Sequence, residues 1–175
     1  MKFLILILLS LIFFSGCSSR AVPHIKRKEI LKPNRNFSQN ENPSYKLKSK
    51  NAITQALYTE YKKWDGSPYC YGGTSKNGID CSSLVQNIYY DAFGVKVPRT
   101  TKEQANVGYR VPRKKTQEGD LLLFKTGYST RHSGIYLESG NFINTSTKHG
   151  VTISNLNNPY WKSKYWQTRR VLPFK

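Results

Sequence analysis

The order of hydrophobic patterns along residues 51–172 constrains the fold of this chain more than any other feature. Up to about residue 92, apolar residues recur at the three- and four-residue spacing of helices. After residue 119 they come in short apolar or alternating runs separated by turn residues. These runs predict strands over 120–124, 132–137, 141–145, 151–154 and 169–172. Helices followed by strands predict an α+β domain.

The helical half contains two clear patterns and one weaker one. One apolar face predicts an amphipathic helix over residues 51–64, formed by Ala52, Ile53, Ala56, Leu57 and Tyr61. A second helix is predicted to begin near Asp80 and to stop at Gly94, and a short third helix is predicted over residues 98–107. The glycine-rich residues 65–79 fit neither periodic pattern, so we expect a loop there.

Residues 1–16 have the features of a secretory signal peptide. Lys2 is followed by apolar runs over 3–9 and 11–14 and then by small residues. The sequence Phe-Ser-Gly-Cys at residues 14–17 resembles a bacterial lipobox, although Phe14 is less usual there than Leu. This resemblance implies that Cys17 is lipidated, whereas the alternative is an ordinary signal peptide with a chance cysteine. Because Ser18 is not the aspartate of an inner-membrane retention signal, we expect the chain on the periplasmic face of the outer membrane.

Residues 17–50 are rich in Asn, Ser, Lys and Arg and show no periodic pattern. We therefore expect a disordered basic tether that begins at the lipidated Cys17 and spans roughly 30 Å as a flexible coil. The aromatic residues and the regular patterns lie almost entirely in residues 51–175, whose length fits one folded domain.

The chain carries 28 Lys and Arg against 10 Asp and Glu, a formal net charge of +18. This balance predicts attraction to polyanions, although it is also compatible with a surface that is merely solvated. Nucleic acid is a poor candidate, because the chain is exported and contains no recognised nucleic-acid-binding motif. Anionic lipid headgroups and cell-wall carboxylates are the polyanions that an exported chain meets.

The stretch GIDCSSLVQ, residues 78–86, places Cys81 at the first turn of the second predicted helix. Unpaired backbone N–H groups and the helix dipole stabilise a thiolate at this position, so Cys81 is a candidate nucleophile. The alternative is a buried, inert thiol that only fills space.

A catalytic thiol needs a base, and the chain has three histidines. His24 lies in the tether. His132 opens the predicted strand HSGIYLE beside a sheet edge, from which it can reach a helix N-terminus packed against the sheet. His149 precedes a glycine in a turn, and we expect it to be exposed. Asn144, in the strand NFINTS, is a candidate third polar group that holds the base, or else it simply faces water.

These residues belong to a longer set of motifs that resembles the NlpC/p60 family of bacterial cell-wall cysteine peptidases. The resemblance covers almost all of residues 51–172 and eight blocks in order. The blocks are SPYCYGG, NGIDCSSLVQ, VPRTTKEQANVG, GDLLLF, RHSGIYLESGNFINTS, GVTIS, PYWKSKYW and TRRVLP. The resemblance implies a papain-like α+β domain with N-terminal helices packed on an antiparallel sheet.

The same resemblance implies roles for individual residues. It makes Cys81 the nucleophile, His132 the general base and Asn144 the group that orients His132. It implies that Tyr69 helps to build the oxyanion site together with the backbone N–H of Cys81. Asp80 and Ser82 match positions that bind the stem peptide of the substrate.

Two positions depart from the family pattern, and one cysteine is left over. Ser83 stands where the family usually has Gly, and Asn144 stands where relatives of the outer-membrane type often have His. We expect these departures to affect the rate more than the reaction. Cys70 is expected to pack under the glycine loop, the alternative being a regulatory disulfide with Cys81.

The sequence thus predicts a monomeric, lipid-anchored cysteine endopeptidase that cuts peptidoglycan stem peptides. By resemblance, the bond is the one between γ-linked D-glutamate and diaminopimelate. We expect no metal and no organic cofactor, because the thiol supplies the nucleophile and the helix end supplies charge stabilisation. Two alternatives remain, namely a wall-binding module without activity and a papain-like amidase or acyltransferase.

Overall fold

The structure is a computed structural model that describes residues 50–172. The predicted signal peptide, Cys17 and all but the last residue of the predicted tether lie outside these residues. The helical elements are α1 (Lys50–Trp64), α2 (Cys81–Phe93), α3 (Thr101–Gln104), the 3₁₀ turn η1 (Arg113–Lys115) and α4 (Pro159–Lys164). The strands are β1 (Thr74–Ser75), β2 (Gly78–Ile79), β3 (Tyr109–Val111), β4 (Leu121–Lys125), β5 (Arg131–Tyr136), β6 (Asn141–Ser146), β7 (Gly150–Asn155) and β8 (Tyr165–Arg170).

The two long helices form where the sequence predicts them. The α1 helix begins one residue before the predicted 51–64 and ends at the predicted residue. The side chain of Asp80 caps α2 by accepting a hydrogen bond from the Ser83 N–H. Gly94 ends α2 in the left-handed conformation, with φ 66°, and its N–H donates to the last carbonyls of the helix.

Other elements differ from the prediction. The predicted loop contains the short β1–β2 hairpin, and α3 covers only four of the ten residues predicted as the third helix. Strand β8 covers residues 165–170 instead of the predicted 169–172. The apolar pattern missed its first half, because Gln167 and Thr168 at its centre are polar although they are buried. Strand β3 and helix α4 were not predicted, although Asn158 before Pro159 is a recognisable helix start.

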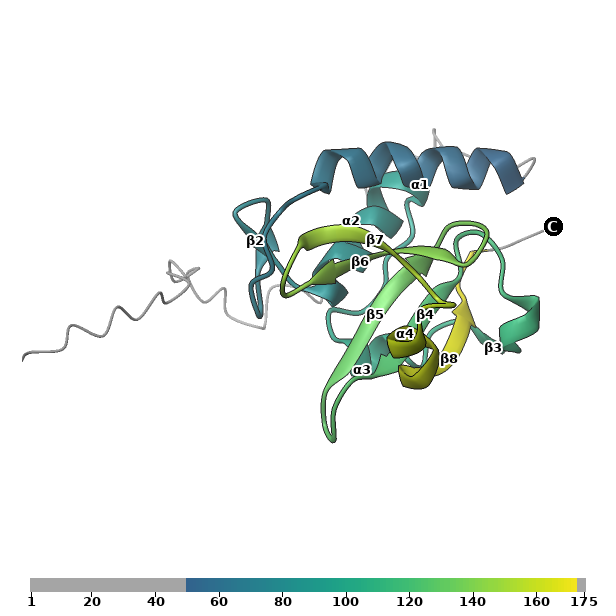
Figure 1. The fold of residues 1–175 in the computed structure, drawn as a ribbon. Coiled ribbons are helices and arrows are strands. Elements are labelled where there is room, and N and C mark those ends of the chain that lie inside the picture. Colours follow the sequence, from purple (N-terminus) through teal and green to yellow (C-terminus); the bar gives the residue numbers. More distant parts are fainter. Residues whose placement is uncertain (1–49, 173–175) are drawn as a thin grey trace, which may run out of the picture. The chain divides into compact units, whose positions relative to one another are not determined.

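The six longer strands form one antiparallel sheet in the order β3-β8-β4-β5-β6-β7. Helix α2 packs on β5 and β6, α1 packs on α2, and α4 contacts β4 (Figure 1). This arrangement confirms the predicted α+β fold of helices on an antiparallel sheet.

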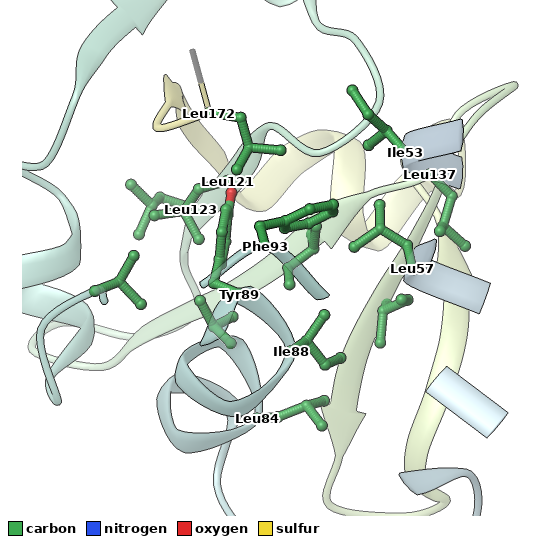
Figure 2. Packing of buried hydrophobic residues seen from close by; sticks show 14 of the residues in the cluster. Ile53, Leu57, Leu84, Ile88, Tyr89, Phe93, Leu121, Leu123, Leu137 and Leu172 are labelled. Carbon is green, nitrogen blue, oxygen red and sulfur yellow. The ribbon is translucent and has the colours of Figure 1, made fainter. Parts of the chain in front are cut away.

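Strand β4 is buried on both faces of the sheet, which explains its continuous apolar run. Leu121 and Leu123 face the large core that α1 and α2 cover, where Ile53, Leu84 and Ile88 also lie (Figure 2). The alternate residues of β4 belong to a second, smaller cluster, which consists of Leu122, Phe124, Phe142 and Leu156 with the partly buried Tyr136, Trp161 and Tyr165 against it. Helix α4 supplies Trp161 to this second cluster.

Strands β5 and β6 pair over a short distance and then separate. Their register contains only two pairs, Ile135–Ile143 and Tyr136–Phe142, whereas β6 and β7 pair over six residues. The contact is close at Gly134, where an added Cβ would lie 2.6 Å from Ile143 O. The expectation that His132 lies beside a sheet edge is wrong, because β5 is an interior strand. The separation of β5 from β6 provides the opening instead.

Candidate active site

Cys81 is the first residue of α2 and lies under the surface. The residue is 8% exposed, and it is a free thiol. Thr101 Oγ1, from the first turn of α3, lies 3.9 Å from Cys81 Sγ. The alternative of a Cys70–Cys81 disulfide is therefore not realised in this structure.

The surroundings of Cys81 act on its thiol in opposite directions. Burial raises the pKa of Cys81, because a charge loses its hydration there. A hydrogen bond and the positive charge from His132 lower it, together with hydrogen bonds from the Ser133 N–H and the Thr101 hydroxyl. The partners prevail, and the pKa of Cys81 falls to about 7. A large fraction of the thiol is therefore ionised at neutral pH.

The second ring nitrogen of His132 faces Asn144. Its Nε2 lies 3.3 Å from Asn144 Oδ1. The amide group of Asn144 donates from Nδ2 to Ser154 Oγ at 2.9 Å and to Thr152 O at 3.4 Å. These two bonds turn Oδ1 toward His132, so Nε2 is the donor and Nδ1 is left for the thiol of Cys81.

A ring that the sequence analysis did not assign to the site covers His132. Trp161 of α4 stacks on the imidazole, with ring centroids 5.2 Å apart and an angle of 26° between the planes. Phe124 and Phe142 hold Trp161 from the second cluster at centroid distances of 4.8 and 5.2 Å. This stack fixes the plane of the imidazole ring.

The carboxylate of Asp80 is saturated with donors from this chain. Oδ1 accepts from the Ser83 N–H at 2.7 Å and from Ser82 Oγ at 3.0 Å, and Oδ2 accepts from the Gly72 N–H at 3.2 Å. Arg99 adds a bidentate contact, Nη1 to Oδ1 at 3.0 Å and Nη2 to Oδ2 at 2.6 Å. Burial works to raise the pKa of Asp80, but Arg99 and the other donors outweigh it and hold the pKa below its usual range.

Arg99 is thus a site residue that the sequence reasoning missed. Its Nη1 also donates to Ser82 Oγ at 2.9 Å, so Asp80 and Ser82 are bonded to each other and to one guanidinium. In the sequence, Arg99 stands between Pro98 and the capping box of Thr100 and Glu103. This pattern marks the start of α3, but it does not indicate that the arginine side chain binds Asp80.

Tyr69 belongs to the glycine-rich loop and lies beside Cys81. Its backbone forms a single bridge with Ile79, and its side chain lines the cavities on both sides of Cys81. Burial raises the pKa of Tyr69, and the negative charges at Cys81 and Asp80 raise it further. The phenol therefore keeps its proton and remains a hydrogen-bond donor.

Two hollows flank Cys81, and both include Tyr69, Thr130 and Arg131. The first, which we name the His132-side hollow, is also lined by His132, Thr145, Lys148, His149, Ser154 and Trp161 among others. The second, which we name the Asp80-side hollow, is also lined by Asp80, Ser82, Arg99, Thr101 and Lys102 among others. His149 is exposed, as predicted, and lies in the turn between β6 and β7.

The arrangement fits a cysteine-dependent hydrolase. The model of the NlpC/P60 family matches residues 66–170. The chain belongs to the NlpC/P60 family. It is 41% identical over 139 residues to a probable endopeptidase of Haemophilus influenzae, an alignment that covers 75% of this chain and 86% of that protein.

A second relative and a solved structure are also similar to this chain. The chain is 43% identical over 120 residues to the murein DD-endopeptidase MepS/murein LD-carboxypeptidase of Escherichia coli, with 69% of this chain and 64% of that protein covered. The crystal structure of an NlpC/P60 family protein from Bacillus cereus superposes with a TM-score of 0.62 at 33% identity. It covers 69% of this chain and 40% of that one.

Within residues 50–172, no three His, Cys, Asp or Glu residues gather in a way that could hold a metal ion. Neither do these residues include a helix long and apolar enough to cross a membrane.

The low pKa of Cys81 predicts how its reactivity depends on pH. In the purified full chain, we expect alkylation of Cys81 by iodoacetamide to accelerate with rising pH through a midpoint of about 7, because the thiolate is the reactive form. His132→Ala should move the midpoint upward, since the burial of Cys81 then remains without its main counterweight. The rate is followed for the Cys81 peptide by mass spectrometry, with His24→Ala as the control. An unchanged midpoint in His132→Ala would show that His132 does not stabilise the thiolate.

Proposed function

We propose that this chain is a peptidoglycan endopeptidase that cuts stem peptides by thiolate attack from Cys81. One observation carries the proposal. His132, whose Nε2 lies 3.3 Å from Asn144 Oδ1, acts on the thiol at the N-terminus of α2 and helps to lower its pKa to about 7. The family match and the name of the Escherichia coli relative supply the substrate class.

The reaction begins when the thiol proton passes to Nδ1 of His132. The sulfur then attacks the carbonyl carbon of the scissile amide, and the carbonyl oxygen becomes an oxyanion. The N–H of Cys81 has no partner within the helix because it lies in the first turn, and it is one donor to this oxyanion. The phenol of Tyr69 is the second.

The tetrahedral intermediate collapses when Nδ1–H of His132 protonates the amide nitrogen. The C–N bond breaks, the amine leaves, and a thioester remains on Cys81. A water molecule then gives a proton to Nδ1 and attacks the thioester carbon, and the C–S bond breaks. The products are a carboxylic acid fragment and the regenerated thiol. Trp161, stacked on His132, keeps the plane of the imidazole ring fixed through both halves of the cycle.

The bond that we propose is the γ-D-glutamyl–diaminopimelate bond of the stem. The second candidate is the D-alanyl–diaminopimelate crosslink, which the DD-endopeptidase name of the Escherichia coli relative favours. The two are distinguished by their products. Cutting within the stem of an uncrosslinked disaccharide-tetrapeptide releases a diaminopimelate-containing dipeptide, whereas cutting the crosslink turns a dimer into two intact monomers.

The full chain should therefore convert at least one of these two muropeptides, and the new termini identify the bond by mass spectrometry. Cys81→Ser should abolish conversion while the protein stays folded, because serine lacks the low pKa of the thiol and is nearly isosteric. Retention of more than about a tenth of the activity would assign the nucleophile to another residue. A wild-type chain that binds both muropeptides without cutting either would support the wall-binding alternative, and transfer of the acyl group to an amine would support the acyltransferase alternative.

The bond from His132 to Asn144 predicts a partial loss. Asn144→Ala removes the acceptor that holds Nε2–H while leaving nucleophile and base in place, so kcat should fall about 5- to 150-fold, as for one hydrogen bond of about 1–3 kcal/mol. Asn141→Ala removes an amide from the same strand, away from His132, and should change kcat less than about twofold. Should Asn144→Ala be silent while His149→Ala abolishes turnover, His149 would be the third member.

We also propose membrane attachment through lipid on Cys17, at the periplasmic face of the outer membrane, and a monomeric enzyme with no cofactor. The support for the anchor is the lipobox-like sequence at residues 14–17. Cys17→Ala should therefore appear in the soluble periplasmic fraction or persist as an unprocessed precursor. Recovery of this variant in the membrane fraction after a high-salt wash would contradict lipid attachment. Release by salt would instead indicate that the basic tether binds the membrane electrostatically.

A further inference from the structure

The amide of Asn144 has to be held in one orientation for His132 to work as a base. Asn144 is fully buried, and its Oδ1 lies 3.3 Å from Nε2 of His132. The oxygen and nitrogen ends of a carboxamide have nearly the same size, so packing alone does not distinguish them. Hydrogen bonds to the far end of the amide therefore decide which atom His132 meets.

An amide turned the other way round would stop the proton transfer. A neutral imidazole has one donor nitrogen and one acceptor nitrogen. When Oδ1 of Asn144 faces Nε2, the ring proton is on Nε2, and the lone pair of Nδ1 is available for the thiol proton of Cys81. When Nδ2 faces Nε2, the ring proton has to be on Nδ1. His132 can then no longer take a proton from Cys81.

Strand β7 supplies both partners that hold the amide. Asn144 of β6 is paired with Thr152, and Ser154 is its diagonal neighbour on the same face of the sheet. Nδ2 of Asn144 donates to Thr152 O at 3.4 Å and to Ser154 Oγ at 2.9 Å. Because a carbonyl can only accept, Thr152 O determines that the NH₂ end of the amide faces β7.

The two bonds differ in strength. An N–H···O bond ordinarily has a length of about 2.7–3.2 Å, so the bond to Thr152 O is long and the bond to Ser154 Oγ is ordinary. Among the described residues, Nδ2 of Asn144 has no third partner. Without the hydroxyl, the long bond alone would hold the amide to β7, and Oδ1 would be free to rotate away from His132.

We propose that Ser154 is a positioning residue for the reaction, whose hydroxyl holds the Asn144 amide so that Oδ1 keeps the Nε2–H of His132. The inference rests on the proposed function and deepens it. Ser154 acts on the thiol of Cys81 through Asn144 and His132. A hydroxyl on β7 thus keeps the base of β5 in the tautomer that accepts the thiol proton.

The test uses two substitutions of the same shape at residue 154. Ser154→Thr keeps the hydroxyl and adds a methyl group, whereas Ser154→Val adds the same bulk without the hydroxyl. On the muropeptide that the full wild-type chain cuts, kcat of Ser154→Val should lie about 2- to 12-fold below that of Ser154→Thr, with KM unchanged, as for one neutral hydrogen bond. The control Ser75→Val changes an exposed serine of β1 outside both hollows and should match the wild type.

A double-mutant cycle shows whether the hydroxyl acts through Asn144. In the Asn144→Ala background the amide is absent, so threonine and valine at residue 154 should give the same kcat. A difference that persists in this background would overturn the proposal, because the hydroxyl would then act elsewhere, for example on the substrate in the His132-side hollow. Equal kcat for Ser154→Thr and Ser154→Val in the otherwise unchanged chain would overturn it as well.

Alkylation of Cys81 gives a readout that needs no substrate. A ring that is no longer held turns away from the sulfur, so Ser154→Val should move the pH midpoint of alkylation upward, while Ser154→Thr should leave it at about 7. A lower melting temperature of Ser154→Val with an unchanged midpoint would show a merely structural role and overturn the proposal. A wild-type chain that cuts neither muropeptide contradicts the proposed function instead, and the two midpoints still decide the role of Ser154.

Discussion

The carboxylate of Asp80 holds together three segments on which the site depends. It caps α2 through the Ser83 N–H, fixes the glycine loop through the Gly72 N–H, and binds the guanidinium of Arg99 ahead of α3. A buried charge is costly unless it is fully hydrogen-bonded, and here both oxygens are occupied. The same carboxylate therefore fixes the N-terminus of α2 and the wall of the Asp80-side hollow. It also fixes the position of Cys81, which follows Asp80 in the chain.

The separation of β5 from β6 is the second condition for the site. Had the two strands stayed paired beyond Ile135 and Ile143, the Ser133 N–H would have bonded to β6, and it could not lower the pKa of Cys81. Gly134, next to the last paired residue of β5, leaves no room for a Cβ beside Ile143 O. Strands β5 and β6 therefore lack part of their hydrogen-bond ladder, and the Ser133 N–H that is left unpaired lowers the pKa of Cys81 instead.

The elements that could be predicted from the sequence are those whose cause is local. An acidic cap followed by an apolar face predicts α2 and the place of Cys81, and alternation places His132 and Asn144 on neighbouring strands. The position of Arg99 depends on a carboxylate nineteen residues away. Trp161 likewise reaches His132 because α4 folds back over the smaller cluster. Strand β8 was misplaced because its buried Thr168 bonds to Thr116 and Tyr165 instead of contributing to an apolar pattern.

The burial of Cys81 has a consequence for the lifetime of the protein. A sulfur that ionises near neutral pH is also the one that peroxides oxidise most readily, first to sulfenic acid and then beyond recovery. Cys81 is 8% exposed, and among the described residues the two hollows lead to its sulfur. Oxidative inactivation is then limited by access and not by the reactivity of the sulfur. A peptide that occupies the hollows shields the thiol from oxidants for as long as it stays bound.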